Sequence, residues 1–149
     1  MPSSTEPLRN ELRIAAPPEV VFLYFTDPAR MVDWMGVAAV LDPRPGATFR
    51  VEANGPDVVL GRYVEVEPPH RVVFTWGFEG TDPIAAPGAT RVEVTLEPDG
   101  DGTRLTLLHH GLPDGLRDAH AEGWAHYLAR LAPTAAGRPP EPDPWIVYD

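Results

Sequence analysis

The chain has 149 residues, of which 43% are hydrophobic, so it is long enough for one domain with a substantial core. Its net charge is −10 and it contains no lysine, which argues against nucleic-acid binding and excludes Schiff-base chemistry. Cysteine is absent, and the only serines are Ser3 and Ser4, so disulfides, zinc–thiolate sites and a serine-hydrolase triad are not expected.

Targeting, membrane and cofactor signals are also missing from the sequence. The segment Met1–Leu8 is polar and does not resemble a secretory signal, and no stretch approaches the roughly 18 apolar residues of a membrane helix. No glycine fingerprint of the dinucleotide or P-loop type appears, so we predict no cofactor. We therefore expect a cytoplasmic protein without a membrane partner, with a disordered tail over residues 1–7.

The first part of the chain predicts a strand and two short helices. Leu8–Ala15 alternates moderately and reads as a strand. Pro17 and Pro18 suit the first turn of a helix that Asp27-Pro28 should end, and Ala29–Trp34 should form the second helix. The buried stripe of the first helix should consist of Val21, Phe22 and Phe25.

After Gly36 the hydrophobic period changes to two, which predicts six further strands. Pro68 and Pro69 have no amide hydrogen to donate, so the ladder should be interrupted there by a turn between two strands. Gly80–Ala89 should be an exposed loop. The six strands are expected at Val37–Asp42, Thr48–Ala53, Val58–Glu67, Arg71–Phe78, Thr90–Glu97 and Thr103–His110.

A long amphipathic helix should follow, with Asp114 as its N-cap and its end near Ala132. Beyond it, residues 133–149 are rich in proline and should form an extended tail that ends in the apolar segment Trp145–Tyr148. The inner face of the helix should carry Leu116, His120, Gly123, Trp124, Tyr127, Leu128 and Leu131.

Several short motifs occur in an order that is typical of one family. They are Ala16–Phe22, Thr26-Asp27-Pro28 with Trp34, Arg44-Pro45-Gly46, Gly61–Trp76, Leu96–Leu105, Gly111-Leu112-Pro113 and His120–Trp124. On these residues the chain resembles the heat-shock protein 90 ATPase activator homologue (AHSA-type) family, within the START-like and birch-pollen-allergen-like superfamily. The resemblance covers roughly residues 11–132.

The resemblance implies an α+β helix-grip (START-like) fold. A curved antiparallel sheet of about seven strands would wrap around the long C-terminal helix, with two short helices after the first strand. The domain would span residues 8–132, followed by the extension 133–149. The chain departs from the family pattern at Met35, where many relatives carry a second tryptophan, and in its proline-rich tail. Both departures could reshape one end of the cavity between sheet and helix.

Eight residues are candidates for contact with a ligand in that cavity. Strand parity with Leu105 and Leu107 places His109 on the cavity side and His110 outside. His109 and His120 would supply polarity, either as ligand partners or as an acid–base pair, unless each is a buried histidine satisfied by its neighbours. No histidine spacing indicates a metal site. The candidates for apolar contact are Trp34, Tyr63, Phe74, Trp76, Trp124 and Tyr127.

Three functions remain open from the sequence. The first is a module without catalytic residues that binds a small apolar or aromatic molecule in the cavity. The second is an enzyme of the cyclase, aromatase or hydrolase type that uses His109 or His120. The third is a protein-interaction module, chaperone-related or a homodimer, with Trp145–Tyr148 as its docking element.

Overall fold

The computed structural model describes residues 6–79, 90–138 and 141–146 of the chain. Its element order is one strand, two short helices, six strands and one long helix, as the sequence predicts. The loop predicted at 80–89, most of the tail predicted at 1–7, and residues 147 and 148 of the apolar segment lie outside the described residues. The elements are β1 (Leu8–Ile14), α1 (Pro18–Thr26), α2 (Pro28–Met31), β2 (Ala38–Leu41), β3 (Thr48–Glu52), β4 (Val58–Glu67), β5 (Arg71–Trp76), β6 (Thr90–Asp99), β7 (Gly102–His110) and α3 (Asp114–Ala135).

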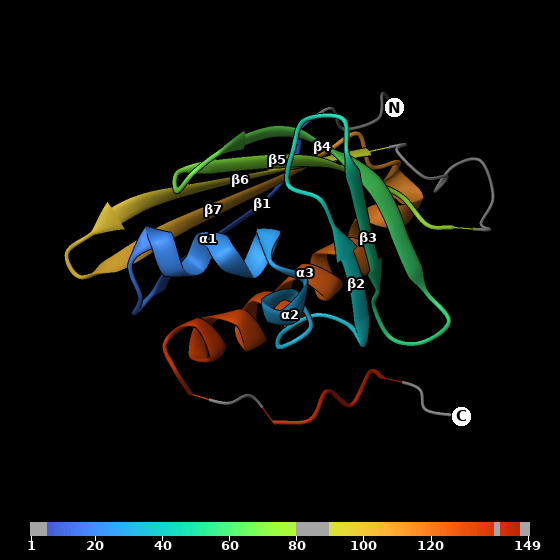
Figure 1. Ribbon diagram of the computed structural model, residues 1–149. Coiled ribbons are helices and arrows are strands. Elements are labelled where there is room, and N and C mark those ends of the chain that lie inside the picture. The colour runs from blue at the N-terminus through green and yellow to red at the C-terminus, as the bar shows by residue number, and fades with distance from the viewer. Residues whose placement is uncertain (1–5, 80–89, 139–140, 147–149) are drawn as a thin grey trace.

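The seven strands form one antiparallel sheet in the order β1-β7-β6-β5-β4-β3-β2. Consecutive strands from β2 to β7 are neighbours, and β1 adds to the free edge of β7. Figure 1 shows that the sheet bends strongly, because β2 and β3 run across the direction of β5, β6 and β7. Helices α1 and α3 lie on the inner side of this bend, which is the helix-grip arrangement expected from the sequence (Figure 1).

The bend is made possible by a close approach between β4 and β5 at Gly61. A Cβ atom at this position would lie 1.9 Å from the carbonyl oxygen of Thr75, so only glycine fits. Further along β4, its pairing with β5 shifts by one residue between Tyr63 and Glu65. This bulge reverses which side chains of β4 face inward, because Tyr63 is buried before it and Val66 packs on the core after it.

The two short helices close one end of the sheet. The buried residues of α1 include Val21, Phe22 and Phe25, as predicted from their helical spacing. The Asp27 carboxylate accepts a hydrogen bond from the amide of Ala29 at 3.0 Å and so caps α2, which ends at Met31, earlier than the predicted Trp34.

Helix α3 is longer than the sequence predicted. It continues through Pro133 to Ala135 rather than ending near Ala132, and Pro113 rather than Asp114 is its N-cap. The end is set by Gly137, whose φ of +89° suits the left-handed position that follows a helix, and whose amide bonds to the carbonyl of Thr134 at 3.1 Å. The proline is tolerated because it lies in the last turn.

Candidate functional site

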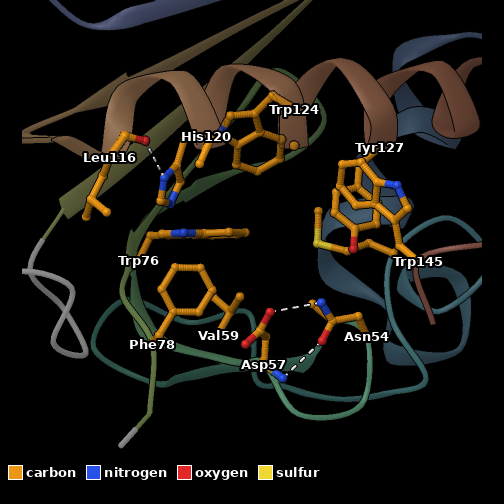
Figure 2. Close-up of a pocket in the computed structure, with 14 residues that line it drawn as sticks. Asn54, Asp57, Val59, Trp76, Phe78, Leu116, His120, Trp124, Tyr127 and Trp145 are labelled. Carbon is orange, nitrogen blue, oxygen red and sulfur yellow. Dashed lines mark hydrogen bonds between the residues drawn. The ribbon is translucent and has the colours of Figure 1, made fainter. Parts of the chain in front are cut away.

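A cavity of about 280 Å³ lies between the first half of α3 and the bent part of the sheet (Figure 2). Helix α3 forms one wall, and the end of β5 with the β3–β4 loop forms the other. Asp57 and Ala119 are exposed, so the cavity opens to solvent beside them. The lining residues are Met35, Ala53, Asn54, Asp57, Val59, Trp76, Phe78, Leu116, Ala119, His120, Gly123, Trp124, Tyr127 and Trp145.

One end of the cavity is aromatic. The ring of Trp76 lies 4.9 Å from that of Trp124 and 6.3 Å from that of Phe78, measured between centroids. His120 reaches the same end, with its ring 5.7 Å from that of Phe78. Figure 2 shows His120 pointing from α3 toward Trp76 and Phe78. These rings present flat apolar surface of the kind that pairs with another aromatic ring.

Behind this end, a chain of hydrogen bonds fixes His109. The indole Nε1 of Trp124 donates to Nδ1 of His109 at 3.0 Å, so the other ring nitrogen of His109 carries the hydrogen. That nitrogen, Nε2, donates to the hydroxyl of Thr90 at 2.7 Å, and the hydroxyl donates to the carbonyl of Trp76 at 2.8 Å. Burial, with the neighbouring His120 and His110 adding to it, lowers the pKa of His109 to about 3. His109 is therefore neutral, and both of its ring nitrogens are used in these hydrogen bonds.

In His120, only one of the two ring nitrogens has a hydrogen-bond partner among the described residues. Its Nδ1 lies 2.9 Å from the carbonyl oxygen of Leu116, which can only accept, so Nδ1 carries the hydrogen. Burial also lowers the pKa of His120, and the hydrogen bond to Leu116 opposes that shift. Its Nε2 is thus an acceptor, and it is buried without a hydrogen-bond partner among the described residues. The Nε1 of Trp76 is a buried donor in the same condition.

The opposite end of the cavity is polar and belongs to the β3–β4 loop. The side chain of Asn54 donates to the Asp57 carboxylate at 2.9 Å and accepts from the Asp57 amide at 3.0 Å. Figure 2 shows this pair across the cavity from α3. The loop therefore holds itself in shape without help from the other wall.

The C-terminal extension supplies the last piece of wall. The buried carboxylate of Asp143 accepts from Nε2 of His126 at 2.9 Å and from the amide of Trp145 at 2.9 Å, with Arg130 3.9 Å away. The ring of Trp145 stacks on that of His126 with centroids 3.6 Å apart. The backbone of Glu141 accepts a further bond from Arg130 at 2.7 Å. The extension thus folds back on the outer face of α3. One of the three functions considered from the sequence had Trp145–Tyr148 as a docking element for a partner.

Four of the eight predicted ligand contacts line the cavity. These are Trp76, His120, Trp124 and Tyr127, three of them on α3 and one at the end of β5. Tyr127 stands beside Trp145, with ring centroids 5.6 Å apart, and burial raises its pKa to about 12. The inner face of α3 was therefore predicted well by its helical period.

The other four belong to the core and not to the cavity wall. Trp34 packs edge-on against Phe25 at 5.2 Å and donates to the carbonyl of Tyr24 at 2.9 Å. The hydroxyl of Tyr63 donates to the carbonyl of Phe25 at 2.8 Å, and burial raises the pKa of this hydroxyl. Phe74 stacks on Phe49 at 4.1 Å.

His109, the fourth, lies behind Trp124 and shares no wall of the cavity. The acid–base pair expected from His109 and His120 is accordingly not available. Although the two rings are 5.2 Å apart, both nitrogens of His109 are used in structural hydrogen bonds. His110 is half-buried, with its Nε2 3.4 Å from a carboxylate oxygen of Glu93.

Sequence reasoning missed most of the polar and small residues of the wall. Gly123 was placed on the inner face of α3 but not among the contacts; a Cβ atom there would meet nothing within 4 Å. Phe78 follows Trp76 at strand spacing, which was the available signal. Asn54 and Asp57 lie in a loop, where no periodicity points to a cavity. The two departures from the family pattern, Met35 and the proline-rich tail, both contribute to the cavity wall, the tail through Trp145.

Within residues 6–79, 90–138 and 141–146, no group of three or more His, Cys, Asp or Glu side chains is placed to hold a metal ion. Among the helices of the same segments, none combines the length and the apolar character of a membrane span.

Comparison with solved structures places the chain among proteins of similar fold. An AHSA1-like protein from Rhizobium etli is 42% identical, with 99% of this chain and 91% of that chain covered and a TM-score of 0.75. A protein from Chromobacterium violaceum is 25% identical, with 94% and 100% covered and a TM-score of 0.76. CalU16 from Micromonospora echinospora is 26% identical, with 91% and 83% covered and a TM-score of 0.72.

No curated protein matches the chain significantly. The family described as Activator of Hsp90 ATPase homolog 1-like protein, in contrast, matches residues 15–136, which is most of the chain and includes β2 to β7, α1, α2 and α3. The resemblance stated from the motifs is thereby confirmed. The chain belongs to the Activator of Hsp90 ATPase homolog 1-like protein family.

Proposed function

We propose that this protein binds a small apolar or aromatic molecule in the cavity between α3 and the sheet. The observation that carries the proposal is the cavity of about 280 Å³ itself, walled by Trp76, Trp124 and Phe78. Its volume is close to the roughly 300 Å³ at which pockets for drug-sized ligands begin. Because the cavity is open, water contacts the apolar surface of its aromatic rings, and an apolar occupant that displaces this water gains the free energy of burying that surface.

Gly123 supports the same conclusion. A glycine inside a helix costs about 1 kcal/mol relative to alanine, and nothing within 4 Å would obstruct a methyl group here. The packing of the folded chain therefore gives no reason for glycine at this position. Space for a ligand beside α3 does give one.

The geometry supports binding better than catalysis by histidine. His109 is locked in the bonds to Trp124 and Thr90, so His120 is the one histidine among the described residues that lines the cavity, and its buried Nε2 has no partner among them. The polar pair across the cavity, Asn54 and Asp57, is engaged with itself. A docking role for the C-terminal segment has less support, because Trp145 packs on its own domain against His126.

A thermal-shift measurement with a panel of apolar and aromatic compounds tests the proposal. At least one compound should raise the melting temperature of the wild-type protein in a concentration-dependent way, because a ligand that binds only the folded state stabilises it. Gly123→Leu should abolish the rise, since its side chain would enter the cavity. Gly115→Leu is the matched control on an exposed turn of the same helix and should keep the rise.

Gly123→Leu is preferable to Trp124→Ala, because Trp124 also holds His109 and its loss would disturb the core. If no compound in the panel shifts the melting temperature of the wild-type protein, the proposal fails. It also fails if Gly123→Leu and Gly115→Leu respond alike.

A further inference from the structure

Two residues that line the same end of the cavity each carry a buried ring nitrogen, an acceptor in His120 and a donor in Trp76. Nε2 of His120 and Nε1 of Trp76 are both buried, and neither has a hydrogen-bond partner among the described residues. Both rings lie against Phe78, at centroid distances of 5.7 and 6.3 Å (Figure 2). Buried polar atoms are nearly always hydrogen-bonded in folded proteins, so two orphans in one pocket need an explanation.

The roles of the two atoms are fixed by their chemistry. Because the carbonyl of Leu116 can only accept, the hydrogen of His120 is on Nδ1, and Nε2 is left with a lone pair. An indole nitrogen is a donor only, so Nε1 of Trp76 can bond only to an acceptor. A hydroxyl group that reached both nitrogens would satisfy them together, because it donates and accepts at once.

We propose that the molecule bound in this cavity is an aromatic compound with a neutral hydroxyl group, a phenol, which donates to Nε2 of His120 and accepts from Nε1 of Trp76. The inference rests on the proposed function. A ketone or an ether accepts only and leaves Nε2 of His120 unpaired. A carboxylate also accepts only, and its negative charge would stand in an acidic protein of net charge −10 without a cation at this end.

The other residues of the cavity wall also favour an aromatic ring as the group that bears this hydroxyl. The rings of Trp76 and Trp124 lie 4.9 Å apart and tilted by 46°, and they offer faces and edges to a third ring. Gly123 leaves open space beside them on α3. A cavity of about 280 Å³ suits a compound of one or two rings rather than a larger one.

The test compares two probes of nearly the same shape, 2-naphthol and 2-methylnaphthalene, by titration calorimetry at pH 7, where a phenol is neutral. The wild-type protein should bind 2-naphthol about five to ten times more tightly, the preference expected of a neutral hydrogen bond at a buried site. His120→Phe keeps a ring of similar size but removes Nε2, and it should abolish the preference. His110→Phe, on the outer face of β7, is the matched control and should keep it.

Each outcome is decisive. If both probes bind with equal affinity to the wild-type protein, the phenol inference is wrong while the proposed function stands. If neither probe binds, the phenol inference is wrong, and the proposed function fails as well if no compound of the thermal-shift panel binds. A preference that survives in His120→Phe overturns the role of His120.

A second variant covers the case in which His120→Phe does not fold. Trp76→Phe removes the donor, and it should lower the ratio of the two affinities at least twofold. Trp34→Phe, at an indole that is already bonded to Tyr24, is its control and should leave the ratio unchanged. Equal ratios in these two variants would overturn the role of Trp76.

Discussion

The indole of Trp124 donates to Nδ1 of His109 at 3.0 Å and in this way joins α3 to β7, the strand next to the edge strand β1. The same histidine donates to the hydroxyl of Thr90 on β6, and this hydroxyl donates to the carbonyl of Trp76 at the end of β5. A chain of hydrogen bonds across three strands therefore holds the aromatic end of the cavity in place. This support explains how the open cavity keeps a defined wall.

Thr90→Val should destabilise the protein by about 2–3 kcal/mol. Valine has the shape of threonine but leaves Nε2 of His109 without a partner in a buried place and removes the hydroxyl bond to the carbonyl of Trp76. Thr95→Val, at a half-buried position of the same strand, should change the stability much less. Urea unfolding of both variants measures the difference, and equal losses would show that the chain of bonds contributes nothing.

The stability of the fold should decrease between pH 7 and pH 5. His109 has a pKa of about 3 in the folded state and about 6.5 in the unfolded chain. Above pH 6.5 it is neutral in both states. As the pH falls below 6.5 the unfolded chain takes up a proton that the folded state does not, so the free energy of unfolding decreases until about pH 3.

Between pH 7 and pH 5 this loss amounts to about 2 kcal/mol. The lowered pKa of His120 acts in the same direction, and carboxylates such as Glu11, whose pKa is lowered from 4.5, stay ionised in this range. His109→Gln can still accept from Trp124 and donate to Thr90 but has no proton to take up. Its unfolding free energy, measured in urea at three pH values, should therefore fall less steeply than that of the wild type; parallel slopes would contradict the assignment.

Gly123→Ala should stabilise the protein by about 0.5–1 kcal/mol. The methyl group meets nothing within 4 Å, and alanine has the higher helix propensity. Gly115→Ala, in the exposed first turn of α3, is the comparison, and its increase in stability should be no larger than that of Gly123→Ala. Both gains are read from the shift in the urea midpoint. A loss of stability in Gly123→Ala would mean that the space beside α3 is already filled.

Asp143→Ala should loosen the C-terminal extension and destabilise the protein by about 1–3 kcal/mol. The carboxylate is buried and accepts from His126 and from the amide of Trp145, so its removal leaves those groups unpaired. Proteolysis between α3 and Trp145 should become faster. Asp118→Ala, at an exposed position on α3, serves as control, and equal cleavage rates in the two variants would sink the idea that Asp143 anchors the extension.

The fold was largely predictable because its signals are local. The run Val58–Glu67 was predicted with the bounds that β4 has, since alternation and flanking turns mark both ends. Helix α3 was predicted too short because its end was placed near Ala132, before the proline-rich tail, whereas a proline in the last turn removes a single hydrogen bond and Gly137 sets the end. The helical period also identified the α3 side of the cavity correctly.

The sheet side of the cavity was less predictable, for physical reasons that particular residues show. A bulge between Tyr63 and Glu65 changes strand parity, and no periodicity reports it. Trp34 and Phe74 are aromatic, but whether a ring faces a cavity or the core depends on partners far away in sequence, here Tyr24 and Phe49. The return of Trp145 to His126 depends on a buried carboxylate at Asp143, which the composition of a proline-rich tail does not reveal.

The most direct test of ligand binding in this cavity uses the indole N–H signals of the four tryptophans in a proton–nitrogen correlation spectrum. On titration with 2-naphthol, the signals of Trp76 and Trp145, which line the cavity, should shift in a saturable way. The signal of Trp34 should stay in place, because its indole is buried in the core and bonded to Tyr24. Four signals that remain unchanged up to the solubility limit of the probe, or a Trp34 signal that shifts as much as that of Trp76, would contradict binding at this site.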